Sequence, residues 1–398
     1  MTRRSIFAAR TNWTLEENAY TLALRRHKRS GREILDLTVS NPTVCGFQYD
    51  ETAILGALEN SVGLRYEAQP KGLLSARAAV AQYYQEIGVT VDPERLILTT
   101  GTSEAYSFLF RLVCEPGDEV LIAHPSYPLF DFLASIQDVK LRPFRLLYDH
   151  GWEIDFAELE NGIGAWTRAI LLVHPNNPTG NFITTREAEK LNALCSRHNL
   201  ALVMDEVFLD YRLKNACARG ESHGSFACNS SVLTFVLSGL SKISALPQMK
   251  IGWIASNGPE NLVRDAVARL EVIADTYLTL NAPIQHALPV LLAQRRSLQP
   301  QLLSRIGSNL DALDAPLATQ NLVTRLEFEG GWYAVLRAPA VQSDENLAID
   351  LLDRCSVAVH PGHFYEFSGE GFLVISLLTP TNQFEEGMRR VLTAINAT

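Results

Sequence analysis

Short apolar runs that alternate with helical stretches constrain the fold of this chain more than any other feature of its sequence. Each run has the length of a β-strand, is apolar almost throughout and ends in small or polar residues. The runs cover residues 96–99, 120–123, 169–173, 201–204, 233–237 and 251–255, and helical patterns such as 103–114 and 185–198 separate several of them. Strands without a polar face are typical of a sheet that helices cover on both sides. The alternation therefore predicts a largely parallel sheet of the α/β class.

The pattern changes after about residue 285, and this change divides the chain. A length of 398 residues allows two or three domains. The sequence predicts a long helix over 287–305, a strand that begins near Gly330, and further helices over 346–354 and 383–397. We therefore expect a large domain over 45–285 and a smaller α+β domain over 286–398. The N-terminal segment 1–44 contains a strand-like run at 34–39, and we expect it to pack with the small domain.

Charge, hydropathy and cysteine spacing exclude several classes of partner. The formal net charge of -9 disfavours nucleic acid, and no apolar run approaches the roughly 18 residues of a membrane span. The N-terminus lacks the apolar segment of a secretory leader. The six cysteines form no C-x-x-C pair and indicate reduced thiols in a cytoplasmic protein. His360 and His363 have no third ligand nearby, so we interpret them as part of a loop and predict no metal site.

Residues with reactive or ligand-binding side chains follow the apolar runs, where the carboxyl ends of parallel strands would bring them together. Gly101, Thr102 and Ser103 form a small-residue turn before a helix, which offers backbone N–H groups and hydroxyls to an anion. By itself such a turn is more often an ordinary helix start. The loop 174–180 holds two asparagines between two prolines, which restrict its shape, although it would also serve as a simple turn.

Two ionisable side chains stand at the ends of strands that we expect to be buried. Asp205 follows the run 201–204, and a carboxylate in such a place needs a cation or a protonated ring nitrogen as its partner. Lys242 lies beyond the run 233–237, between Ser241 and apolar residues. A single lysine is usually a solvated surface charge, but one in this position is a candidate for an amine of lowered pKa that forms Schiff bases.

Taken in order, these motifs resemble those of the class I/II aminotransferases of fold type I, which carry pyridoxal 5'-phosphate (PLP). The resemblance extends from residues 40–43 to 373–379 and implies a mostly parallel, seven-stranded sheet covered by helices, with a smaller α+β C-terminal domain. The motifs that carry it are Gly101-Thr-Ser-Glu, Asn176-Asn-Pro-Thr-Gly180, Asp205-Glu206, and Ser241-Lys242 with Lys250 eight residues later.

The resemblance also implies a role for each of these residues. Lys242 would hold the cofactor as a Schiff base and, once released, move the α-proton of the substrate. Asp205 would keep the pyridine nitrogen protonated, Asn177 would donate a hydrogen bond to the ring oxygen, and Tyr127 would stack on the ring. The residues implied to bind the cofactor phosphate are Gly101, Thr102, Ser103, Ser241 and Lys250.

Tyr66 adds an implication about assembly. It begins the motif Tyr-Glu-Ala-Gln-Pro-Lys-Gly, which matches a family tyrosine that reaches the phosphate bound by the partner subunit. The resemblance therefore implies a homodimer in which each subunit completes the site of the other.

Two departures from the family pattern lie in the cofactor site. Phe208 stands where the family has a tyrosine that donates to the ring oxygen, which leaves Asn177 as the main donor unless Tyr211 or another group substitutes. Lys250 stands where arginine is common, so the charge is kept and the bidentate geometry is lost.

A third departure concerns the substrate. Val374 stands where the family usually has an arginine that clamps the α-carboxylate of the substrate. Either another cation takes over this role, or the substrate lacks an ordinary α-carboxylate. The candidate cations are Arg26, Arg65 and Arg337.

The expected activity is the transfer of an amino group from an amino acid or amine to a 2-oxo acid, in two half-reactions that depend on PLP. Two alternatives stay open. A PLP-dependent lyase, decarboxylase or cyclase would use the same fold and cofactor for another reaction, which the altered substrate position at Val374 allows. A non-enzymatic binding protein would retain the fold without the chemistry.

Overall fold

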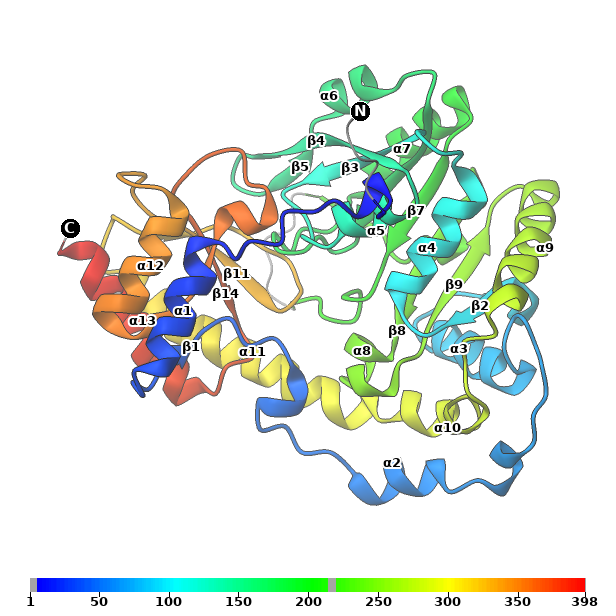
Figure 1. Cartoon of the computed structure of the whole chain (residues 1–398), viewed down its shortest axis with the longest axis horizontal. Coiled ribbons are helices and arrows are strands. Elements are labelled where there is room, and N and C mark those ends of the chain that lie inside the picture. The colour runs from blue at the N-terminus through cyan, green and yellow to red at the C-terminus, as the bar shows by residue number, and fades with distance from the viewer. Residues whose placement is uncertain (1–5, 214–219, 398) are drawn as a thin grey trace.

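The computed structural model describes residues 6–213 and 220–397, and its largest feature is an eight-stranded sheet (Figure 1). The strands lie in the order β2-β9-β8-β7-β6-β3-β4-β5. Pairing is parallel from β4 through β3, β6 and β7 to β8, and antiparallel for β4–β5, β8–β9 and β9–β2. The prediction of a mostly parallel α/β sheet is therefore confirmed. The strands are β2 Leu96–Thr99, β3 Glu119–His124, β4 Lys140–Tyr148, β5 Trp152–Ile154, β6 Thr167–Val173, β7 Ala201–Asp205, β8 Thr234–Gly239 and β9 Gly252–Asn257.

The sheet has one strand more than the seven expected from the sequence. The hairpin of β4 and β5 forms its edge, and β5 folds back on β4 after His150 and Gly151, which both have positive φ. β4 exposes much of its length and contains Lys140, Arg142 and Arg145, and β5 has only three residues. Neither strand therefore resembles the buried apolar runs from which the sheet was predicted.

Helices cover both faces of the sheet, because side chains alternate along each strand between two apolar clusters. Leu98 and Met204 belong to one cluster, and their neighbours Ile97 and Val203 belong to the other. The first cluster includes side chains of α2 Glu51–Leu58, α3 Leu74–Glu86, α6 Phe156–Gly162, α7 Thr185–His198 and α10 Ala282–Ala293; the second includes α4 Thr102–Val113, α5 Phe130–Ile136 and α9 Glu260–Tyr277. Among the helices described here, none has the length and apolar character needed to cross a membrane.

The strand directions bring the predicted motifs to one edge of the sheet. Because β9 is antiparallel to both β8 and β2, the strand β2 runs in the same direction as β8. The carboxyl ends of β2, β3, β6, β7 and β8 therefore meet the start of β9 at a single edge. The helix α8 Leu240–Ile243 follows β8 at this edge, and the turn that leads into α4 follows β2 there.

A second group of elements is built around a four-stranded antiparallel sheet in the order β10-β11-β14-β13. The two-residue strand β1 Leu35–Asp36 pairs with β12 Val357–Ala358, and α1 Ala19–Arg29 lies against α12, so the N-terminal segment packs with C-terminal elements. The domain boundaries at 44 and 285 stay predictions. The remaining elements are β10 Thr324–Arg325, β11 Tyr333–Arg337, β13 His360–Pro361, β14 Phe372–Ser376, α11 Arg295–Leu317, α12 Asp344–Cys355 and α13 Thr381–Asn396.

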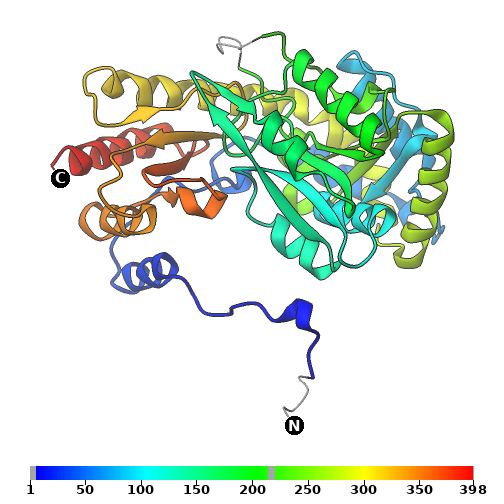
Figure 2. The ribbon, with the colours of Figure 1, turned by 90° about the horizontal axis from the view of Figure 1, so that it is seen from above.

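The chain before α1 reaches back to the large sheet, as Figure 2 shows. The ring of Trp13 lies edge-on to that of Phe132 on α5, with 5.8 Å between the ring centroids. Trp13 Nε1 donates to Ser135 Oγ at 3.4 Å, and Arg10 forms an ion pair with Asp138. The N-terminal segment therefore contacts both groups of elements.

The single helix predicted over 287–305 is wrong, because the chain forms two helices that meet at Gln294. The carbonyl of Gln294 accepts hydrogen bonds from the backbone N–H groups of Ser297 and Leu298 and from the Ser297 hydroxyl. This arrangement begins a new helix, α11, which lies beside α13 (Figure 1). Pro289 and Pro300 lie inside the predicted range, but each stands within one of the two helices and not at Gln294, so the sequence indicated a disturbed helix without indicating where it breaks.

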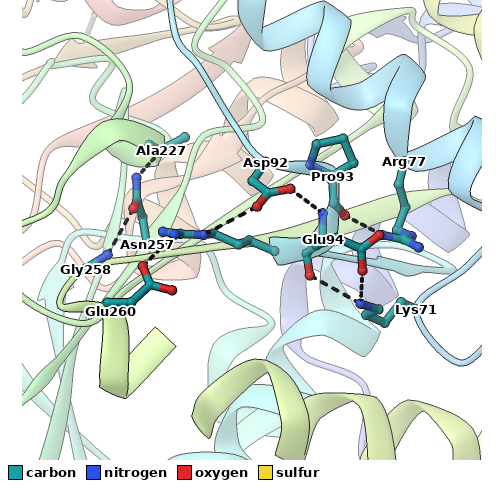
Figure 3. Close-up of polar contacts among 10 residues, drawn as sticks. Lys71, Arg77, Asp92, Pro93, Glu94, Ala227, Asn257, Gly258 and Glu260 are labelled. Carbon is teal, nitrogen blue, oxygen red and sulfur yellow. Dashed lines mark hydrogen bonds and ion pairs between the residues drawn. The ribbon is translucent and has the colours of Figure 1, made fainter. Parts of the chain in front are cut away.

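A polar cluster fixes the edge strand β2 and the chain that follows Tyr66 (Figure 3). Glu94 forms ion pairs with both Lys71 and Arg77, and the Leu98 backbone N–H of β2 donates to the Lys71 carbonyl at 3.0 Å. Arg95 bridges to Glu260 at the start of α9, with 2.7 Å between Nη2 and Oε2. The segment 66–72 is thereby held against the sheet on the side away from the small antiparallel sheet.

The turn at Gly180 joins the loop 174–180 to the chain that enters β11, and it requires glycine. Gly180 has φ +69°, and its carbonyl accepts from the backbone N–H groups of Glu329 and Gly330 at 3.0 and 2.9 Å. A Cβ at this position would overlap the Gly330 carbonyl oxygen and the Phe328 side chain. We expect Gly180→Ala to reduce the free energy of unfolding by roughly 2 to 3 kcal/mol in a urea titration.

Gly56 provides the matched control for this variant. It lies in the exposed part of α2, and nothing stands within 4 Å of the position that a Cβ would take. Gly56→Ala should raise the free energy of unfolding by up to about 1 kcal/mol. Equal effects of the two substitutions would contradict the assignment of Gly180 to a strained junction.

Candidate active site

A cavity of about 300 Å³, here called the inner cavity, lies at the edge where the strand ends meet. It is lined by every residue predicted for the site except Tyr66. A second hollow of about 430 Å³, the outer cavity, continues from it and shares Ser40, Tyr127, Asn177 and Tyr333 with it. The predicted residues that line the inner cavity are Gly101, Thr102, Ser103, Tyr127, Asn177, Asp205, Ser241, Lys242 and Lys250.

Lys242 lies on the short helix α8, directly after the buried strand β8. Burial lowers the pKa of its amine to about 8, and the nearby Asp205 carboxylate opposes this shift. Its Nζ lies 4.6 Å from the centroid of the Trp332 ring and 5.4 Å from that of Phe208. Because of this shift, a larger fraction of the Lys242 amine is neutral and nucleophilic at physiological pH than of a solvated lysine.

Asp205 ends strand β7 and faces the same cavity. Its Oδ2 accepts from the Tyr106 hydroxyl at 2.7 Å, and its Oδ1 accepts from the Val207 backbone N–H at 3.0 Å. Burial raises the pKa of this carboxyl to about 6, although both hydrogen bonds and Lys242 favour the charged form. A cationic ligand group beside Asp205 would supply the opposite charge that the buried carboxylate lacks.

Asn177 presents an unpaired polar atom to the cavity. Its side-chain oxygen is buried and has no hydrogen-bond partner among the described residues. The preceding Asn176 donates through Nδ2 to the Pro125 carbonyl at 3.0 Å and to Thr179 Oγ1 at 2.7 Å, which fixes this loop to the one that carries Tyr127. Since orphaned buried amide groups are rare, Asn177 is placed to meet a ligand.

The other end of the inner cavity is suited to an anion. Gly101 is the N-cap of the twelve-residue helix α4, whose first-turn N–H groups point away from the helix. Thr102, Ser103 and Ser241, which all carry hydroxyls, also line the inner cavity. A Cβ on Gly101 would lie 3.9 Å from Lys250 Nζ, so this ammonium stands beside the helix N-terminus.

Close backbone contacts build this end of the cavity. A Cβ on Gly252 would lie 3.0 Å from the Gly101 Cα, and one on Gly239 would lie 2.8 Å from the Ile251 carbonyl oxygen. Lys250 itself has φ +49°, a left-handed conformation that costs a non-glycine residue of the order of 1 kcal/mol. Lys250 adopts this conformation in the turn before β9, and the turn places its side chain at the inner cavity.

Tyr66 lies apart from the site in its own subunit. Its side chain is 81% exposed and lines a different hollow, with Gln69, Leu98 and Leu278. Tyr106, which the sequence analysis missed, lines the inner cavity instead. It stands four residues after Thr102 on α4, so helical spacing from the predicted turn could have indicated it.

The structure also places the positions that depart from the family pattern. Phe208 is 3% exposed and packs edge-on against Trp332, with 5.4 Å between ring centroids. Tyr211 does not supply the missing phenol, because its hydroxyl donates to the Lys242 carbonyl at 2.7 Å. Val374 is buried at 1% exposure, and none of the three candidate arginines lines either cavity: Arg26, Arg65 and Arg337.

These groups fit pyridoxal phosphate. Asp205 suits the ring nitrogen, the side-chain N–H of Asn177 suits the ring oxygen, Lys242 suits the aldehyde, and the helix N-terminus with Lys250 suits the phosphate. Among the described residues, no cluster of three or more His, Cys, Asp or Glu side chains could hold a metal ion. The residues around the cavity thus provide a partner for each functional group of this cofactor.

Comparison with known proteins agrees with this geometry. The family model for aminotransferase class I and II matches residues 49–391. The glutamate-pyruvate aminotransferase AlaA of Haemophilus influenzae is 27% identical over 379 residues, which cover 92% of this chain and 91% of that protein. The alanine aminotransferase of Mycobacterium tuberculosis is 29% identical over 337 residues, 82% of this chain and 77% of that protein.

A solved structure extends the likeness to the whole fold. The alanine aminotransferase of Pyrococcus furiosus superimposes with a TM-score of 0.86 over 95% of this chain and 96% of that one, at 22% identity. A likeness at this level of identity establishes the arrangement of both sheets and says nothing about the substrate.

The raised pKa of Asp205 predicts how stability depends on pH when the cofactor is removed. Below pH 3.8 the carboxyl is protonated in both the folded and unfolded states, and its burial penalty develops as the pH rises to about 6. In cofactor-free protein, Asp205→Asn should therefore increase the free energy of unfolding by roughly 2 kcal/mol at pH 8 and change it little at pH 4. Urea titrations at the two pH values measure the difference; a loss of stability at pH 8 would contradict the assignment.

Proposed function

Since the chain belongs to the class I and II aminotransferase family, we propose that Lys242 is its catalytic base and that the cavity residues bind the cofactor in the roles given below. The protein is a PLP-dependent aminotransferase and acts on amino acids and 2-oxo acids. The main support for these roles is that Lys242, Asp205 and Asn177 stand at the ends of three separate strands and line one cavity.

When bound, pyridoxal phosphate supplies an aldehyde carbon that condenses with amines and a ring that accepts electrons from the α-carbon of the amine. Lys242 Nζ would hold the aldehyde, and as a free amine it would take the proton from the substrate's α-carbon. Its lowered pKa supports this role, because a neutral amine is needed to accept that proton. Trp332 and Phe208 keep water from one side of the Nζ atom.

Asp205 would hold a proton on the ring nitrogen, because its carboxylate charge stabilises the protonated ring. The Tyr106 hydroxyl and the Val207 N–H fix the carboxylate in one orientation. Asn177 would donate to the ring oxygen, and the aromatic ring of Tyr127 would cover the cofactor ring. The residues that line the cavity and would bind the phosphate are Gly101, Thr102, Ser103, Ser241 and Lys250.

The names of the relatives suggest which substrates to test first. Of the two relatives described above, one is named for glutamate and pyruvate and the other for alanine. We therefore propose L-glutamate with pyruvate, and L-alanine with 2-oxoglutarate, as the first pairs of amino donor and acceptor.

We also propose that the protein acts as a cytoplasmic homodimer with Tyr66 contributed across the interface. The exposure of Tyr66, and that of Leu64 at 90%, supports burial against a second copy. The described cysteines are all unpaired, which supports a reducing compartment; they are Cys45, Cys114, Cys195, Cys228 and Cys355.

Lys242→Ala tests the catalytic assignment. The variant should lose at least roughly 100-fold in kcat, because a positioned acid–base group contributes about 10²- to 10⁴-fold. Transfer from L-glutamate to pyruvate is followed by alanine formation. Mass spectrometry after borohydride reduction should find the cofactor attached to Lys242 in the wild type. Lys190→Ala, whose ammonium lies over the Phe156 ring on the surface, is the control and should retain full activity; activity retained by Lys242→Ala would refute the assignment.

Mixed dimers test the position of Tyr66. Tyr66→Ala and Lys242→Ala chains, each weak as homodimers, are unfolded together in equal amounts and refolded. If Tyr66 acts across the interface, hybrid dimers contain one intact site, and the mixture should recover about one quarter of wild-type activity. A mixture of Lys242→Ala with Asp205→Asn should recover none, because both residues belong to the same site. No recovery in the first mixture would place Tyr66 outside the partner's site.

A further inference from the structure

The outer cavity contains a polar side chain that the proposed reaction has not used. Beyond the residues that it shares with the inner cavity, its walls include Phe364, Tyr365 and His360. The cations that line the two cavities among the described residues are Lys242 and Lys250, and both belong to the inner cavity. An anionic substrate group in the outer cavity therefore meets no fixed positive charge in the described part of this subunit.

His360 stands at a defined place relative to Val374. The two residues are direct partners in the antiparallel pair β13–β14. Side chains of directly paired residues lie on the same face of a sheet, about 5 Å apart at Cβ. The imidazole therefore projects from the strand beside the short, buried Val374 side chain and reaches the cavity that valine cannot reach.

The hydrogen bond between His360 and Tyr365 orients the imidazole. The Tyr365 hydroxyl lies 3.1 Å from Nδ1. We assign the hydroxyl as the donor to Nδ1, which places the ring proton on Nε2. Burial lowers the pKa of His360, which keeps the ring neutral, and burial raises the pKa of Tyr365, which keeps the phenol protonated.

The neighbouring groups leave Nε2–H as a donor for a ligand. The side-chain oxygen of Asn18 at the rim accepts from the Thr21 backbone N–H at 2.7 Å. Asp36 lies near His360, but its carboxylate accepts from the backbone N–H and the hydroxyl of Thr38. The side-chain oxygen of Asn18 and the carboxylate of Asp36 thus have partners already, whereas no described residue bonds to Nε2 of His360.

We propose that His360 donates a hydrogen bond from Nε2–H to the carboxylate next to the reacting carbon of the amino acid and 2-oxo acid substrates. This bond would make the protein specific for substrates that carry this carboxylate. The inference rests on the proposed function, since it places the substrate between Lys242 and the outer cavity. A single N–H donor replaces a fixed cation in this arrangement. A hydrogen bond to a charged acceptor is strong enough to select a carboxylate, although it lacks the geometry of a bidentate clamp.

The test compares amino donors that differ only in the carboxylate. The pairs are L-alanine with ethylamine, L-glutamate with 4-aminobutyrate, and L-tyrosine with tyramine, each followed in a single turnover of the holoenzyme by the cofactor absorbance. His360→Ala should lower kcat/KM about 10- to 100-fold for an amino acid that the wild type uses, mainly through KM, and change the rate with the amine less than about twofold. His360→Gln, which keeps an N–H donor, should recover part of the loss.

A binding measurement provides a readout that does not depend on turnover. Propionate and glutarate lack an amino group and cannot react, so their affinity for the holoenzyme is measured by calorimetry. His360→Ala should weaken the binding of whichever acid the wild type binds by about 10-fold or more, and His360→Gln should weaken it less. His363→Ala is the control, because His363 is exposed in the same turn and lines neither cavity.

The outcomes separate this inference from the proposed function. Equal losses of rate for the amino acid and its amine, or binding of both acids that does not change in His360→Ala, would overturn the role of His360. A wild-type preference for the amines would also overturn it, and would indicate a substrate without a carboxylate. A wild type that responds to no donor would contradict the proposed substrates, and the calorimetry would still decide the role of His360.

Discussion

The burial of an amine and a carboxylate in one cavity is the constraint on which the site depends. Away from water, Lys242 and Asp205 shift toward their neutral forms, with pKa values near 8 and 6. This electrostatic cost arises because the parallel strands bring both side chains to the same buried edge of the sheet. The Tyr106 hydroxyl donates to the Asp205 carboxylate and the Tyr211 hydroxyl donates to the Lys242 carbonyl, and these bonds fix the two residues in place. A cofactor that brings complementary groups removes part of the cost, so ligand binding and stability are coupled.

The sequence was informative where chemistry follows a buried strand. The rule that parallel strands end at a common edge predicts that Gly101, Asn177, Asp205 and Lys242 lie together, and all four line the inner cavity. Each of these residues stands within a few positions of an apolar run, so a local pattern was enough. The cover of the sheet by helices followed from the same runs, because their residues are apolar on both faces.

The features that the sequence did not indicate depend on contacts between distant segments. The sequence indicated a loop at His360. The role that we propose for this residue depends on its pairing with Val374 and on its bond to Tyr365, and neither contact can be seen in the sequence. The break at Gln294 depends on where α10 and α11 pack, without any helix-breaking residue at the junction. The role of Tyr66 involves a second subunit, which no pattern within one chain specifies, and it stays a prediction.

The N-terminal segment sets a mechanical limit on the molecule. Trp13 is attached to α5 beside the large sheet, and α1 begins at Ala19 on the other group of elements, against α12. The backbone between these two points reaches about 20 Å when fully extended. Asn18, near the end of this stretch, lines the outer cavity. As long as the contacts of Trp13 and α1 hold, the separation of these two points is bounded by a covalent length rather than by the strength of any interface.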